Sequence, residues 1–203
     1  MKTLQNNLSN KIEEANEEII HLKRILTFEK KHDYENFNML SRYSPAIIFA
    51  IWEGVFKDFI KYYFSFFNRN NVFKDDLAML TNIIEHNQII KEHYTQFEAK
   101  KRLLIEIKKV FDNPKFNEER PHINPTKFKE TNKFLEKINL NPFDYQKYNT
   151  KYSELAYFRN NIAHWENLVE ISMSDIEEYI ELVYTLIDDL ENNILTQAEK
   201  WNA

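Results

Sequence analysis

Hydrophobic residues recur at steps of three and four along much of the chain, a pattern typical of amphipathic helices. The first run predicts a long helix over residues 4–31, with apolar positions Leu4, Leu8, Ile12, Ala15, Ile19, Leu22 and Leu26. A loop is predicted around residues 32–42. Ser44 and Pro45 then have the order of an N-cap and a proline in the first helical position, which predicts a second helix to about residue 68.

This second helix is apolar nearly all round. Ten aromatic residues fall between Tyr43 and Phe67, so we expect the helix at the centre of the fold. Charged residues in its middle would be costly in hydrocarbon, which argues against a membrane span; they are Glu53, Lys57, Asp58 and Lys61.

The rest of the chain also has helical periodicity. Further helices are predicted, in order, as two over residues 74–112, one over about 126–137, one from near Thr150 and one over 174–197. The last opens with a capping box, Ser174 and Glu177. Residues 112–125 hold three prolines and are predicted to be irregular.

Composition supports a helical fold. The chain has 203 residues, five prolines and a single glycine, Gly54. This argues against sheets joined by tight hairpins and excludes glycine-rich phosphate loops, because both need more glycine. We therefore predict an all-α protein with one domain over residues 1–203, in which residues 70–150 form a helical, loop-rich insertion.

The chain has no cysteine, which excludes disulfides and thiolate zinc sites. With a polar N-terminus that lacks a signal-peptide core, this predicts a cytoplasmic protein. The net charge of −5 argues against indiscriminate nucleic-acid binding but allows a local basic groove. One candidate is the helix face with Lys101, Arg102, Lys108 and Lys109, which follows RNA phosphates or is simply the solvated side of that helix.

The histidines outside one motif do not suggest a metal site. His86 and His93 are seven positions apart, whereas metal ligands on one helix are usually closer, so we interpret both as solvated. His21, His32 and His122 are isolated in sequence. No metal or other cofactor is predicted.

The exception is the segment Arg159-Asn160-Asn161-Ile162-Ala163-His164. At 100° per residue, one face of its helix is apolar, with Leu155, Phe158, Ile162 and Trp165. A roughly opposite stripe is polar, with Ser153, Tyr157, Asn160 and His164. Arg159 lies between the two, and Ala156 and Ala163 lie on a flank that something could approach closely.

These residue types suit cleavage of RNA without a metal. The 2′-hydroxyl is a built-in nucleophile, so the protein need only move protons and stabilise the phosphate. His164 can transfer the proton, Arg159 can bind the non-bridging oxygens, and Asn160 can orient either group. An Arg and a His at this spacing are also common on a solvated helix face or as partners of a nearby carboxylate, and that interpretation stays open.

The motif resembles the signature of the HEPN superfamily. The long first helix, the aromatic second helix SPAIIFAIWEGVFKDFI and the order of the last two helices extend the resemblance over most of the chain, with a loose match at residues 70–150. It implies an antiparallel helical bundle and a metal-independent ribonuclease of toxin or phage-defence type, with Arg159, Asn160 and His164 in the site. It also implies a homodimer in which two motifs line one cleft, and an antitoxin or defence-system partner.

Two further residues are supporting candidates. Family members often place an acidic residue on the second helix near the motif, which Glu53 would provide; otherwise Glu53 simply pairs with Lys57. Tyr157 lies on the polar stripe. Glu166 stands where some members carry a modified tyrosine, so regulation by that modification is not expected. The alternatives to a nuclease are a non-catalytic module that binds RNA, nucleotide or protein, and an inhibitor of a neighbouring toxin.

Overall fold

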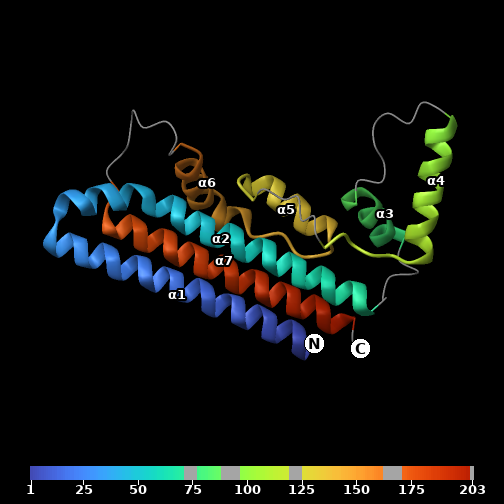
Figure 1. Ribbon diagram of the computed structural model, residues 1–203, viewed down its shortest axis with the longest axis horizontal. Helices are drawn as coiled ribbons and strands as arrows, with labels where there is room; N and C mark the ends of the chain where they lie inside the picture. Colours follow the sequence, from blue (N-terminus) through green and yellow to red (C-terminus); the bar gives the residue numbers. More distant parts are fainter. Residues whose placement is uncertain (71–76, 88–96, 119–124, 162–170, 202–203) are drawn as a thin grey trace.

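The computed structural model describes residues 1–70, 77–87, 97–118, 125–161 and 171–201. Within these ranges the chain forms helices and no strand (Figure 1). The helices are α1 (Lys2–His32), α2 (Tyr34–Asn70), α3 (Leu77–His86), α4 (Phe97–Asp112), α5 (Phe128–Lys137), α6 (Tyr145–Asn161) and α7 (Met173–Lys200). The all-α prediction is confirmed.

Three long helices form the body of the fold. α1 runs antiparallel to α2 and α7, which run in the same direction as each other (Figure 1). Lys11 of α1 pairs with Asp58 of α2 at 3.1 Å, and the rings of Phe67 and Trp201 meet at the ends of α2 and α7 with centroids 6.2 Å apart. α5 and α6 lie on the side of α2 and α7 that faces away from α1, and α3 and α4 lie near the C-terminal end of α2 (Figure 1).

The turn between α1 and α2 is one residue, Asp33. Its backbone N–H donates to the carbonyl of Glu29 at 2.8 Å and so ends α1. Its carboxylate Oδ1 accepts from the N–H groups of Glu35 and Asn36, each at 3.1 Å, which caps α2. The predicted loop over residues 32–42 is therefore wrong, because a single Asp both ends one helix and begins the next.

Pro45 lies inside α2, so the predicted cap at Ser44 is also wrong. Proline lacks the N–H that would complete the helical hydrogen bond to Ser41. The buried hydroxyl of Ser44 does not cap the helix but donates to the backbone carbonyl of Leu40 at 2.9 Å. The hydroxyl of Ser41 donates to the backbone carbonyl of Asn38 at 3.1 Å. The helix continues because its apolar side chains pack against the core on both sides of the proline.

The N-cap of the last helix lies two residues earlier than predicted. Its N-cap is Ser172, whose hydroxyl accepts from the N–H of Asp175 while the Asp175 carboxylate accepts from the N–H of Ser172. A capping box is present, but Ser172 and Asp175 make it, and Ser174 and Glu177 do not. The Ser172–Asp175 hydrogen bonds also lower the pKa of the Asp175 carboxyl.

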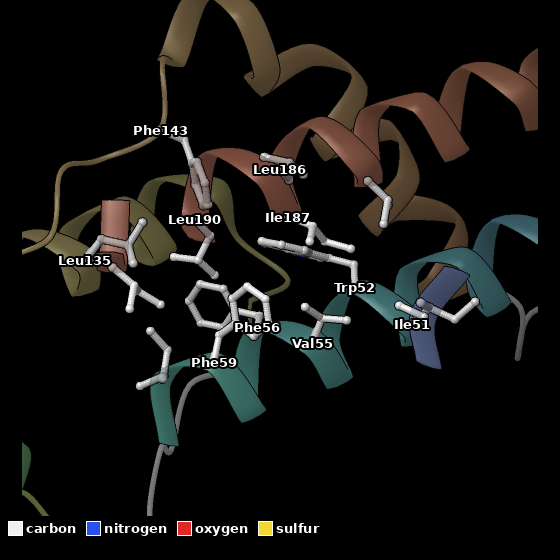
Figure 2. Close-up of a cluster of buried hydrophobic side chains, with 14 of the residues drawn as sticks. Ile51, Trp52, Val55, Phe56, Phe59, Leu135, Phe143, Leu186, Ile187 and Leu190 are labelled. Carbon is white, nitrogen blue, oxygen red and sulfur yellow. The ribbon is translucent and has the colours of Figure 1, made fainter. Parts of the chain in front are cut away.

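α2 fills the centre, as its aromatic composition predicts. Trp52, Phe56 and Phe59 have no measurable exposure. Figure 2 shows them facing Leu186, Ile187 and Leu190 of α7, with Leu135 of α5 and Phe143 completing the cluster. Among the described residues, no helix is both long and apolar enough to cross a membrane.

His86, at the end of α3, is not solvated as expected. Its ring packs against the rings of Phe64, Phe116 and Phe134 at centroid distances of 4.8, 5.6 and 6.2 Å. Its Nε2 lies 3.4 Å from the carbonyl oxygen of Asn117. His86 is therefore part of an aromatic cluster that joins α3 to α2 and α5, which its polar neighbours in sequence did not suggest.

Candidate functional site

The site begins with the cap of α6. The carboxylate of Asp144 accepts hydrogen bonds from the N–H groups of Gln146 at 2.8 Å and Lys147 at 3.2 Å. This side chain satisfies amides that the first turn leaves free, so α6 starts at Tyr145 rather than near Thr150.

One face of α6 is anchored in the core through Tyr152. Its hydroxyl accepts from Nε1 of Trp52 at 3.2 Å and donates to the carbonyl of Pro125. Its ring also meets those of Phe49 and Phe128 edge-on, at 6.0 and 4.9 Å. Burial raises the pKa of Tyr152 to about 12. Tyr152 therefore fixes α6 to α2 and to the segment before α5.

A second set of contacts fixes α6 to α7. The hydroxyl of Tyr148 donates to Asp189 at 2.5 Å. The rings of Phe158 and Tyr179 pack edge-on at 6.1 Å. An exposed ion pair, at 2.6 Å, joins Lys151 of α6 to Glu178 of α7. With anchors on both sides, the rotation of α6 about its own axis is determined by packing.

The side of α6 away from the core is polar, as the helical wheel predicts. Ser153, Tyr157 and Asn160 are exposed, and Leu155 on the apolar face is buried. Ala156 differs from the prediction, because it is 2% exposed. It lies against the chain's own core, so it does not provide a small-residue surface for another molecule.

Arg159 meets Glu53 where the exposed side of α6 faces α2. Nη2 of Arg159 lies 3.5 Å from Oε2 of Glu53, and Nη1 donates to the side-chain oxygen of Asn160 at 3.2 Å. The second oxygen of Glu53, Oε1, pairs with Lys57 at 2.6 Å. The Glu53 carboxylate therefore bridges a neighbour on its own helix and the motif arginine, and its supporting role in the site stays a prediction.

The Glu53 and Arg159 side chains differ in exposure. The Glu53 side chain is 16% exposed and that of Arg159 is 38% exposed, so the acid is set back and the guanidinium faces solvent. A guanidinium has five N–H donors, and these contacts occupy only part of them. Arg159 can therefore bind an anion, such as a phosphate, while Glu53 holds it in place.

The second half of the motif lies outside the described residues. It consists of Ile162, Ala163 and His164. Trp165, Glu166, His93 and His122 lie outside the described residues as well. The structure therefore brings together Arg159, Asn160 and Glu53, and the role of His164 stays a prediction.

The basic residues of α4 are not part of this site. Lys101, Arg102, Lys108 and Lys109 are exposed, and Lys109 pairs with Glu106 at 2.6 Å. α4 stands at the end of the molecule near the C-terminal end of α2, whereas α6 lies over its N-terminal half (Figure 1). Among the apolar residues of α4, Val110 is buried, whereas Leu104 and Phe111 are exposed.

Three residues that determine this geometry were not identified from the sequence. Tyr152 and Trp52 form the anchor, and Asp144 begins the helix. A signal for Asp144 was present, since Asp after a proline and before a periodic segment is a common N-cap. Within the described ranges, no group of three His, Asp or Glu side chains is placed to hold a metal ion.

Comparison with known proteins agrees with this architecture. A family model described as HEPN_MAE_28990-like HEPN matches residues 4–201, nearly the whole chain. No curated protein and no solved structure matches it significantly. HEPN domains have nuclease or RNA-binding roles, which the exposed arginine on α6 suits. The chain belongs to the HEPN superfamily.

Proposed function

We propose that the chain is a metal-independent endoribonuclease whose site comprises Arg159, Asn160 and His164. In this reaction the 2′-oxygen attacks the adjacent phosphorus and the bond to the 5′-oxygen breaks, which leaves a cyclic phosphate and a 5′-hydroxyl. His164 moves a proton from the 2′-hydroxyl or to the leaving oxygen, and Arg159 stabilises the charge on the phosphate.

The observation that carries this proposal is the contact between Arg159 and Glu53. Ion pairs between helices also occur on solvated surfaces, so the contact supports the proposal only through the restraint that it places on the guanidinium. Here Glu53 restrains the Arg159 side chain, which is 38% exposed. Because the guanidinium is already positioned, less conformational entropy is lost when it binds a phosphate. The HEPN resemblance adds that two motifs line one cleft in a dimer.

Cleavage in the presence of EDTA tests the proposal. Purified protein should cut RNA, and His164→Ala and Arg159→Ala should each lower the rate by about a hundredfold or more. Lys129→Ala removes an exposed cation from α5 and should leave the rate unchanged. Full activity in His164→Ala would contradict the proposal, provided that thermal unfolding shows the same fold.

The same contact favours one alternative, a HEPN module that binds RNA, nucleotide or protein without chemistry. A guanidinium already paired with Glu53 and Asn160 resembles a preformed binding group as much as a catalytic one. RNA binding without cleavage, unaffected by His164→Ala but weakened by charge reversal at Lys101 and Lys108, would support that module.

We also propose a cellular role as a toxin or phage-defence effector, held inactive by an antitoxin or a system partner. Expression of the wild type should arrest growth, and expression of Arg159→Ala should not. Arrest by both proteins would contradict a role that depends on cleavage, and arrest by neither would favour the interpretation as an inhibitor.

A further inference from the structure

The exposed face of α1 carries two blocks of opposite charge on either side of an apolar residue. Glu13 and Glu17 come first, Ile20 follows with 44% exposure, and Arg24 and Lys31 come last. At 100° per residue, these five side chains fall within about 60° of one another around the helix axis. They therefore form one stripe, which we call the α1 stripe.

The charges of the α1 stripe do not stabilise their own helix. Glu13 and Glu17 are four positions apart and of like charge, which is unfavourable on an isolated helix. Among the described residues, none of its four charged side chains makes an ion pair. Lys11, on the flank, contrasts with them, since it pairs with both Glu14 and Asp58.

The helix dipole does not explain the arrangement either. The effect of the dipole on charged side chains is confined to the first and last turns. The first turn of α1 has no acidic residue, and Glu13 and Glu17 lie about three to four turns from its start. Arg24 is about two turns from the other end, and of the four charged side chains only Lys31 lies in a terminal turn, where the dipole favours it. The segregation of charge therefore indicates a partner outside the chain.

We infer that the α1 stripe pairs antiparallel with the same stripe of a second copy. When Ile20 faces the partner's Ile20, Glu17 and the partner's Arg24 lie on the same side of the two-fold axis, about 4.5 Å and about 6 Å from it along the helices. The two side chains therefore meet. Symmetry repeats the pair, and Glu13 comes within reach of the partner's Lys31. A parallel arrangement would place like charges together.

The surface around the α1 stripe also fits a second copy of the chain. A hollow of about 420 Å³ lies beside Ile20 and Phe28, and Phe28 is 57% exposed. Apolar side chains at the centre with charges around them are typical of a protein contact. The hollow is also lined by Lys23, Arg24 and Lys31. Nucleic acid is still a poorer occupant of the whole stripe, because Glu13 and Glu17 would repel its phosphates.

This contact is separate from the proposed nuclease site. α1 lies on one side of α2 and α7, and α6 lies on the other (Figure 1). Pairing through α1 therefore leaves the face with Arg159 and Glu53 uncovered. The inference does not depend on cleavage, and it adds a second contact to any pairing of the motif helices.

Charge reversal in the full chain tests the pairing by light scattering or sedimentation. Glu17→Arg and Arg24→Glu should each raise the dissociation constant at least about tenfold and halve the molar mass seen for wild type at tens of micromolar. An equimolar mixture of the two variants should recover the wild-type mass, because the arginine introduced in one variant then faces the glutamate introduced in the other. Folding defects cannot produce recovery on mixing.

The matched control is Glu18→Arg, which changes an exposed glutamate of α1 that lies off the stripe, and it should leave the mass unchanged. High salt should weaken the wild-type assembly. The inference is overturned if wild type has the monomer mass, if neither single variant lowers the mass, or if mixing fails to restore it.

Discussion

Glu53 and Arg159 lie 106 positions apart in the chain, and a carboxylate oxygen of one lies 3.5 Å from a guanidinium nitrogen of the other. The contact joins the central helix α2 to the exposed end of α6. Because the same carboxylate also binds Lys57 at 2.6 Å, its rotamer is held from its own helix. Glu53 therefore has a fixed position from which it restrains the more exposed Arg159.

Glu53→Gln should weaken function without unfolding the protein. The substitution keeps the shape but removes the charge that holds Arg159, so we expect kcat/KM for RNA cleavage to fall about tenfold. The melting temperature should change little, because the Glu53–Lys57 pair is partly exposed. Glu53→Asp, which keeps the charge, should retain part of the activity.

Asp58→Asn is the control for that measurement. Asp58 is also an acidic residue of α2 with a cationic partner, Lys11, but it faces α1 rather than α6. It should leave kcat/KM unchanged. Equal losses in both variants would mean that Glu53 acts only through the stability of α2.

Tyr152→Phe should destabilise the fold. The change leaves the indole N–H of Trp52 and the carbonyl of Pro125 without this partner in the core. We expect the free energy of unfolding, measured in urea, to fall by about 1–3 kcal/mol. For Tyr145→Phe, at a position 56% exposed, it should fall by much less. Similar losses in the two variants would rule out the anchor.

Asp144→Ala should destabilise the start of α6. Loss of the cap removes a side-chain acceptor for the amides of Gln146 and Lys147, at a cost of about 1 kcal/mol in the urea experiment. Asp144→Asn should stay close to wild type, because asparagine caps equally well. An alanine variant as stable as wild type would argue against the cap.

Glu118 should make stability depend on pH. It accepts from Ser65 at 2.5 Å and Asn68 at 2.8 Å, and the Ser65 hydrogen bond, with that of Asn68 and the nearby Arg69 and Lys61, lowers the pKa of Glu118 below 4.5. A lowered folded pKa means that the stabilisation is present above 4.5 and is lost as pH falls through the folded value.

The variant Glu118→Gln isolates this contribution. Wild type should melt at a higher temperature than the variant from about pH 5 to 7, and the difference should shrink below pH 4.5. A difference that stays constant down to about pH 3 would show that the carboxylate charge has no part in it.

Periodicity predicted the helices better than their ends. The apolar stripe of α1 and the aromatic content of α2 determine both helices and their burial. Ends depend on single side chains, and several candidates fit equally well. Ser174 with Glu177 satisfies the capping pattern as well as Ser172 with Asp175 does, and only the packing of α7 decides between them.

The sequence predicted which residues share the polar face of α6, but it did not predict the contact between α6 and α2. The helical wheel separates Leu155 from Tyr157 and Asn160, because both faces belong to one helix. It cannot show that Glu53 reaches Arg159, since that contact depends on how α2 and α6 cross. The family resemblance suggested the acidic residue, and the structure supplies the distance.

Trp52 and Glu53 are adjacent on α2, one in the core and one at Arg159. The packing of Trp52 fixes the rotation of α2 about its axis, and this rotation in turn determines where the Glu53 carboxylate lies. A change in volume around Trp52 would turn this helix slightly and carry Glu53 away from the arginine. Loss-of-function variants should accordingly be found among buried aromatic residues far from RNA, in proteins that remain folded.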